Sequence, residues 1–242
     1  MNTRVSLISL SVLLSPSPLF ASFQVLNWSL KTNVQISGGS QDIDRHQVVT
    51  NPWQFTSISQ MGTNISRADY DFSWLTDGTL GNFNTDLVQT IRTPGVTTIF
   101  DSYIDIFAAS DLLVSVDFAI NYQHTPGDLS DILGAVVIRN LSLPFGQQNV
   151  YNEGRRGGNL SFQPSSGTLS IHREDVLPAG VPYRLIFTTS CDNISDASQP
   201  PTGTIDVAGH INFAITAVPE PSTSLLAMFG LLMATCARRQ RR

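Results

Sequence analysis

The sequence has few of the residues that cover the outer faces of soluble helices. Its 242 residues include one lysine, Lys31, and three glutamates, and charged residues make up only 14%, against roughly 25% in ordinary soluble domains. Lysine and glutamate are good helix formers, whereas the Asp, Asn, Ser and Gly that are plentiful here favour turns. The scarcity excludes a helical bundle and a coiled coil.

Positive charge is also scarce. The formal net charge is −5, which argues against a nucleic-acid partner bound through a basic surface. Between residues 24 and 218 there are 9 Lys and Arg against 18 Asp and Glu, a net charge of −9. The body of the chain is therefore acidic, which suits solubility and contact with divalent cations, and no nucleic acid is expected as a partner.

Cysteine is rare as well. Of the two cysteines, Cys236 lies in an apolar run at the C-terminus. Cys191 is then the only cysteine in the body of the chain, so no disulfide can form there. Ser190 and Asp192 flank Cys191 and predict a loop at this position. Because a reactive thiol needs a histidine and electropositive surroundings, we expect no nucleophilic role for Cys191.

Catalytic and cofactor-binding motifs are missing from the sequence. It has no Gly-x-Ser-x-Gly elbow, no phosphate-binding loop and no dinucleotide fingerprint. The four histidines, His46, His124, His172 and His210, are not spaced as the ligands of a local metal site are. We therefore expect no catalytic residue, no metal and no cofactor, and a protein that is not an enzyme.

What the sequence does have is alternation of apolar and polar residues with a period of two. Three clear stripes lie at residues 68–74, 112–122 and 205–215. Such alternation turns one apolar face of each strand towards a core. The further strand candidates are Phe23–Ile36, Gln47–Ile58, Leu87–Arg92, Thr97–Phe107, Ile132–Asn140, Asn159–Gln163, Thr168–His172 and Pro182–Thr189.

Turn signals rich in Gly and Pro separate these segments, for example at Asp77-Gly78 and at residues 93–95. About ten or eleven short strands with such turns predict an all-β fold. The architecture we expect is a single antiparallel β-sandwich of jelly-roll-like order over residues 23–217. A partly closed barrel is the alternative.

The N-terminus has the features of a secretory signal peptide, which we expect as a helix over residues 1–22. Arg4 gives a positive start, and residues 5–14 form a short apolar core. Helix-breaking prolines then lead to a small residue, Ala21, after which cleavage is expected. The apolar core is too short to span a bilayer unaided.

The C-terminus contains three pieces in series. The prolines of Pro219-Glu220-Pro221 end any preceding strand, and residues 225–237 are apolar without a charge. As a helix these 13 residues span about 20 Å, so local thinning must bridge a hydrocarbon core of roughly 30 Å. Four arginines close the chain and favour the cytoplasmic side, which places the body of the chain outside. They are Arg238, Arg239, Arg241 and Arg242.

This tail, residues 218–242, resembles the PEP-CTERM sorting signal of exported bacterial proteins, in which a Pro-Glu-Pro motif precedes an apolar transmembrane helix and a basic cluster. Here the motif is Pro219-Glu220-Pro221, followed by Ser222 and Thr223. The resemblance implies that an exosortase, a membrane-embedded peptidase, processes the chain near this motif. It also implies delivery to the cell surface or extracellular matrix. It assigns no catalytic residue to this chain.

Aspartate pairs are candidates for acid–base or calcium chemistry. They are Asp69 with Asp71, which are expected to share the polar face of one strand, Asp101 with Asp105, and Asp128 with Asp131. Glycosidases use two carboxylates within about 10 Å of each other. The segment from Asp77 to Asp86 is a candidate calcium loop, because Asn82, Asn84 and Asp86 recur at every second residue. Aspartate is abundant in this chain, so solvated turn and surface residues are the simpler interpretation.

Four aromatic residues, Trp28, Trp53, Trp74 and Tyr103, are candidates for a platform that stacks on sugar rings, although most aromatic residues of a sandwich lie in its core. The leading hypothesis is a non-enzymatic exported protein of the surface or matrix, with a structural or adhesive role. The alternatives are a lectin-like module that binds calcium or carbohydrate, extracellular polysaccharide included, and an enzyme that acts on polysaccharide.

Overall fold

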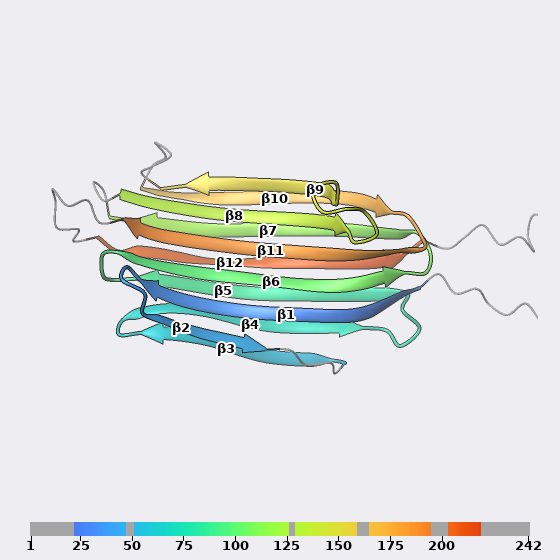
Figure 1. The fold of residues 1–242 in the computed structure, drawn as a ribbon, viewed down its shortest axis with the longest axis horizontal. Coiled ribbons are helices and arrows are strands. Elements are labelled where there is room, and N and C mark those ends of the chain that lie inside the picture. The colour runs from blue at the N-terminus through green and yellow to red at the C-terminus, as the bar shows by residue number, and fades with distance from the viewer. Residues whose placement is uncertain (1–21, 47–50, 126–128, 159–164, 195–202, 219–242) are drawn as a thin grey trace, which may run out of the picture.

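A computed structural model describes residues 22–46, 51–125, 129–158, 165–194 and 203–218, which form two antiparallel β-sheets packed face to face. Figure 1 shows the two layers, with all strands running along the long axis. These ranges contain no helix, and hence none long and apolar enough to cross a bilayer. The signal helix expected at 1–22, Ser22 excepted, and the tail helix expected at 225–237 lie outside the described residues.

Each sheet has six strands, and every pair of neighbours is antiparallel. Sheet A contains, in order, β2 (Gln41–His46), β1 (Phe23–Ile36), β6 (Val96–Ala108), β11 (Val181–Ile194), β8 (Leu129–Asn140) and β9 (Asn149–Gly157). Sheet B contains β10 (Ser166–Leu177), β7 (Leu112–His124), β12 (Ile205–Ala217), β5 (Leu80–Ile91), β4 (Asn64–Trp74) and β3 (Trp53–Met61).

The predicted antiparallel sandwich is confirmed, and its cause is the alternation in the sequence. Along β7, for example, Val114, Val116 and Phe118 are buried, while the residues between them face outwards. From β5 onwards the chain repeatedly crosses between the sheets, as in β5–β6, β6–β7 and β7–β8. The finer jelly-roll-like order stays a prediction.

Side chains, rather than a strand pair, close one edge of the sandwich. The edge strands β2 and β3 belong to different sheets. Asp42 Oδ2 accepts a hydrogen bond from Gln60 N at 2.7 Å, and Asp44 Oδ2 accepts one from Ile58 N at 3.0 Å. These carboxylates satisfy backbone donors that an open edge strand would leave free for other chains. Among the described residues the two sheets thus remain separate, in place of the alternative barrel.

Several strands differ from the sequence prediction. β2 and β9 were not expected, and β5 begins at Leu80 instead of Leu87. β2 and β9 are edge strands with mostly exposed side chains, so neither needs the apolar alternation that reveals an inner strand. The strand expected at Asn159–Gln163 lies outside the described residues.

The two ends of the domain meet at one end of the sandwich, which we call the terminal end (Figure 1). At the start of β1, Phe23 N donates to Gly78 O at 2.8 Å, and after β12 Val218 N donates to Asp111 O at 2.8 Å. A Cβ at Gly78, where φ is +70°, would lie 2.2 Å from Phe23 O. This close approach therefore requires glycine.

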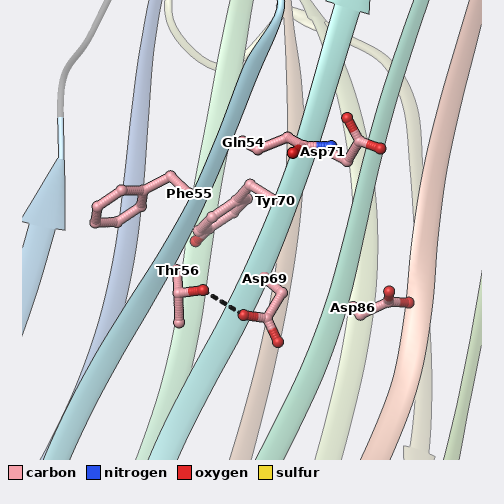
Figure 2. Close-up of a pocket in the computed structure, with 7 residues that line it drawn as sticks. All are labelled: Gln54, Phe55, Thr56, Asp69, Tyr70, Asp71 and Asp86. Carbon is pink, nitrogen blue, oxygen red and sulfur yellow. Dashed lines mark hydrogen bonds between the residues drawn. The ribbon is translucent and has the colours of Figure 1, made fainter.

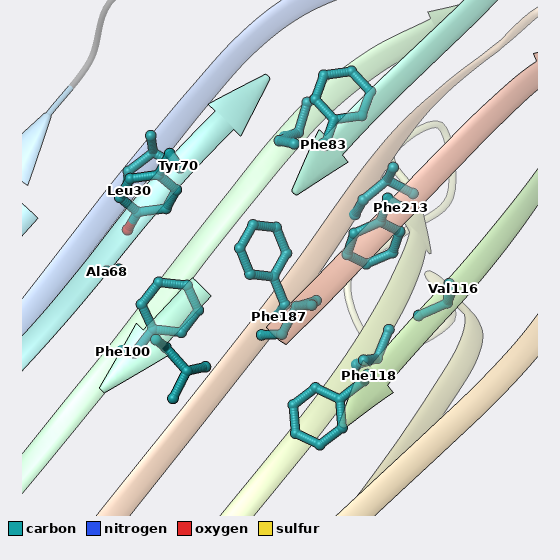
Figure 3. Packing of buried hydrophobic residues seen from close by; sticks show 14 of the residues in the cluster. Leu30, Ala68, Tyr70, Phe83, Phe100, Val116, Phe118, Phe187 and Phe213 are labelled. Carbon is teal, nitrogen blue, oxygen red and sulfur yellow. The ribbon is translucent and has the colours of Figure 1, made fainter. Parts of the chain in front are cut away.

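The core lies between the sheets and changes along the strands. Near the terminal end it is aromatic, and Figure 3 shows Phe83, Phe187 and Phe213 among its packed side chains. The Phe187 and Phe213 ring centroids are 5.4 Å apart. Towards the opposite end, which we call the far end, hydroxyl and amide groups such as Thr189 and Gln89 are buried between the sheets.

Candidate functional site

A shallow hollow of about 630 Å³ lies on the outer face of sheet B, over β3, β4 and β5 (Figure 2). Its lining residues are Gln54, Phe55, Thr56, Asp69, Tyr70, Asp71 and Asp86. Asp69 and Asp86 face each other across the β4–β5 pair, and Asp71 lies two residues further along β4. The predicted placement of Asp69 and Asp71 on one outer strand face is confirmed.

Asp69 is held as a carboxylate. Thr56 Oγ1 donates to its Oδ1 at 2.5 Å, and Arg67 forms an ion pair with it at 2.9 Å. Slight burial works against ionisation, but the bonds from Arg67 and Thr56 lower the pKa of Asp69 below its ordinary value. Acid–base catalysis by two carboxylates needs one with a raised pKa. Asp69 therefore has no proton to donate at neutral pH.

The calcium-loop interpretation of residues 77–86 is wrong in its geometry. Asn82, Asn84 and Asp86 lie on β5, where their two-residue spacing is ordinary strand alternation. Asp77, in the preceding turn, instead accepts from the backbone N and hydroxyl of Thr79, at 3.0 and 2.8 Å. The part of the chain that the structure describes contains no group of three or more His, Cys, Asp or Glu placed to hold a metal ion.

Asp101 and Asp105 lie in different surroundings and do not act as a pair. Asp101 is exposed on β6, whereas Asp105 is buried and accepts two hydrogen bonds from Arg184, at 2.7 and 2.8 Å. The Arg184 guanidinium also lies 3.8 Å from the centroid of the Tyr103 ring. Asp105 is thus committed to a structural ion pair on the outer face of sheet A.

Asp131 has a neighbour that the sequence did not indicate. Its predicted partner, Asp128, lies outside the described residues, but Asp192 faces it across the β8–β11 pair. Burial raises the pKa of Asp192, a hydrogen bond with Thr97 works against this, and the Asp131 charge adds to the rise. Arg156 lies 3.7 Å from Asp131. Only the strand register could have revealed this pairing.

The structure does not assemble the aromatic platform. Trp28, Trp53 and Trp74 pack against one another, with ring centroids 4.9 Å and 5.7 Å from Trp28. Trp28 and Trp53 are buried in the core, and Trp74 is partly buried against it. Tyr103 lies apart from them on the outer face of sheet A, beneath Arg184. These residues hold the fold together instead of presenting a flat aromatic strip.

Cys191 was predicted to lie in a loop, and this was wrong. It is completely buried within β11, and its Sγ donates a hydrogen bond to Gln89 Oε1 at 3.3 Å. Burial raises the pKa of the thiol far above its ordinary value, which keeps the sulfur protonated. A thiol in this state is a poor nucleophile.

The residues predicted to direct sorting lie outside the described residues. They are the motif Pro219, Glu220 and Pro221 and the basic cluster Arg238, Arg239, Arg241 and Arg242. The structure does place their starting point, because Val218 is fixed to Asp111 at the terminal end. The sorting segment therefore leaves the sandwich beside the start of β1.

The solved structures that resemble this chain do so distantly. The enzymatically active domain of bacteriophage CBA120 tailspike protein 4 is 11% identical with a TM-score of 0.29, over 65% of this chain and 19% of that one. Infectious bursal disease virus, Gx strain, is 11% identical with a TM-score of 0.32, over 82% and 57%. The VP2 subviral particle of that virus gives 11% and 0.29, over 81% and 62%.

TM-scores this low do not establish a relationship between this chain and these proteins. The chain spans less than two thirds of the length of each of the three. A search of curated proteins finds none that matches the chain. A family model matches residues 217–242, and its description is the PEP-CTERM protein-sorting motif. The C-terminal end thus identifies the chain as a carrier of a PEP-CTERM protein-sorting motif, which implies an exported protein that is sorted by an exosortase.

Proposed function

We propose that this chain is a non-enzymatic protein of the cell surface or extracellular matrix, whose sandwich has a structural or adhesive role. The observation that carries the proposal is the sorting motif at residues 217–242. That motif implies export and C-terminal anchoring in the membrane before processing. The passenger that reaches the destination is then the acidic sandwich.

The order of the pieces in the tail supports this path. The apolar residues 225–237 follow the Pro-Glu-Pro motif, and the four terminal arginines follow them. Arginines at the end of a membrane segment hold that end on the cytoplasmic side. The sandwich is then held outside, where processing near Pro219-Glu220-Pro221 releases it from the membrane segment.

A structural role is supported by the state of the candidate chemical groups. Asp69 is kept ionised by Arg67 and Thr56, and Asp105 is paired with Arg184. The tryptophans that a sugar platform would need are packed in or against the core. These observations favour the structural role over the lectin-like and enzymatic alternatives.

The proposal is tested by cell fractionation of three forms in a host with the cognate exosortase. The first is the full chain, the second lacks residues 219–242, and the third carries Arg238→Gln and Arg239→Gln. A matched control carries Arg155→Gln and Arg156→Gln, the same charge change on the exposed edge strand β9. We expect the full chain and the control to reach the surface fraction through a membrane-bound precursor.

The truncated form should be absent from the membrane fraction and should appear in the soluble exported fraction. The arginine variant should accumulate in a fraction other than the surface fraction, because its tail has lost half of its positive cluster. Identical fractionation of all four forms would refute the proposed delivery. Release of reducing sugar from matrix polysaccharide by the purified protein would refute the non-enzymatic role.

A further inference from the structure

We infer that the terminal end of the sandwich is a lipid-contacting surface, which rests on the bilayer while the tail is still inserted in it. The inference goes beyond anchoring by the tail, because it assigns a membrane contact to the folded domain itself. It is carried by the distribution of exposed apolar side chains and by the short distance to the membrane segment.

Exposed apolar side chains gather at the terminal end. The described residues expose twelve large hydrophobic side chains, and nine of them lie in or beside the turns and strand ends there. The nine are Leu26, Leu75, Leu80, Leu113, Leu143, Phe145, Val150, Val176 and Val218. The other three, Ile43, Ile58 and Val88, lie further towards the far end. Clustered exposed apolar groups mark a contact surface, whereas scattered ones do not.

Part of this surface is a continuous row across sheet B. Leu80 faces Thr216 across the β5–β12 pair, Thr216 faces Leu113, and Leu113 faces Val176 across the β7–β10 pair. Neighbouring strands lie about 4.8 Å apart, so the apolar side chains of Leu80, Leu113 and Val176, with Thr216 between the first two, form a rim about three strand spacings wide. The rim lies on the outer face, at the end where Val218 leaves the domain.

Phe145 extends the same surface from sheet A. It lies in the loop between β8 and β9, and its side chain is 91% exposed. The loop begins after Asn140, which faces Tyr183 near the start of β11, so it is at the terminal end. A fully exposed phenylalanine is costly in water, since burying such a ring gains about 1.5–3 kcal/mol. The ring is suited to the apolar layer just beneath lipid headgroups.

The length of the chain beyond Val218 keeps the rim near the bilayer. Leu225 begins the apolar run, and six residues separate it from Val218. Fully extended, the seven steps between the two residues span at most about 25 Å. Val218 lies at the same end of the domain as the rim, so a bilayer holding residues 225–237 must lie close to this end.

The carboxylates at this end are compatible with contact at headgroup depth. Asp111 Oδ1 accepts a hydrogen bond from Ala179 N at 2.8 Å, and Asp77 accepts two from Thr79. Both acids are thus engaged in turns at the tip. The contact we infer is shallow, with apolar side chains entering the interface and the acidic groups remaining in water.

The test uses the full chain reconstituted alone into vesicles at a low protein-to-lipid ratio, and only protein that floats with the vesicles is measured. One variant carries Phe145→Trp and its matched control carries Ile43→Trp, an exposed position on β2 far from the rim. The quencher is a lipid with a nitroxide near the headgroup. Emission is compared with that of the parent chain, whose tryptophans are packed in or against the core.

We expect the tryptophan of Phe145→Trp to emit at shorter wavelength than that of Ile43→Trp and to lose intensity with the labelled lipid. The labelled lipid should quench Ile43→Trp no more than it quenches the parent. Equal quenching of both variants, or of neither, in the floating fraction would overturn the inference. A shift at position 145 without quenching by the labelled lipid would also overturn it, because protein would then cover the rim.

Discussion

The two halves of the sandwich core are built from different chemistry. Near the terminal end, aromatic rings pack together in the core: Trp28 of sheet A lies 5.5 Å from Phe72 of sheet B, and Phe72 lies 5.4 Å from Phe83 of its own sheet. Towards the far end, polar groups pair between the sheets, as where Thr189 Oγ1 donates to Gln89 Oε1 at 2.7 Å. One half is held mainly by apolar burial, and the other includes directional bonds.

The difference matters because the two kinds of contact contribute unequally to stability. A buried aromatic ring gains its full transfer free energy on folding, whereas a buried hydrogen bond replaces one made with water and nets only about 1 kcal/mol. Unfolding free energies vary within one domain according to such differences. The aromatic half should therefore be the last to open, and it is the half to which both chain ends are fixed.

The difference between the two halves can be tested at two residues of β11. The larger loss of stability is expected at Phe187. This residue is completely buried in β11 and contacts the rings of Phe100 and Phe213. Phe187→Ala should cost about 3–5 kcal/mol, because it leaves a cavity that packed rings cannot fill. Urea unfolding of the tail-less domain measures the change, and a loss under about 1 kcal/mol would contradict the account.

Thr189, two residues further along β11, should give a smaller effect. It is equally buried, but its contribution is the bond to Gln89. Thr189→Val keeps the shape and removes the hydroxyl, so we expect a loss of about 1 kcal/mol in the same urea experiment. The Gln89 carbonyl keeps one partner, the thiol of Cys191. A loss as large as that of Phe187→Ala would remove the distinction between the two halves.

The smallest effect is expected at Asp192, on the outer face of the far half, and it depends on pH. Its pKa is raised from the ordinary 3.8, chiefly by burial, so the folded state favours the protonated acid. The stability that this gives is present below about pH 3.8 and is lost as the pH rises through the raised pKa. Asp192→Asn should therefore match the parent at low pH and exceed it at pH 7.

The gain at pH 7 should be under about 1 kcal/mol, because solvent screens a partly exposed charge. Thermal melting of both proteins across this pH range measures it. Asp101→Asn, an exposed position on β6, serves as the control for removal of one negative charge. A gain in stability that is equal for both variants, or greater at low pH, would show that ionisation of Asp192 does not destabilise the folded state.

Much of the fold was predictable from the sequence because inner strands must alternate. β1 was predicted with its observed bounds, Phe23–Ile36, and the stripes that became β7 and β12 were clear. β2 and β9 escaped prediction because an edge strand with exposed side chains needs no apolar stripe. The polar residues Ser190 and Asp192, which flank Cys191, likewise made the end of β11 resemble a loop.

The candidate site was less predictable, since it depends on register. Asp69 and Asp71 were placed on one face correctly, because both lie on a single strand. The pairing of Asp131 with Asp192 joins residues 61 positions apart, and no local pattern records it. The tail was different again. Its three pieces follow one another directly in the chain, so the sorting motif was recognisable without any tertiary structure.

We propose that both apolar ends serve only to deliver the protein and that the sandwich between them is the part that reaches the cell surface or matrix. The most direct measurement is the intact mass of the protein recovered from the cell surface or matrix, with sequencing of both termini. We predict an N-terminus near Ser22 and a C-terminus near Pro219-Glu220-Pro221, without the residues that follow. Recovery of a chain that still carries residues 225–242 would contradict the account.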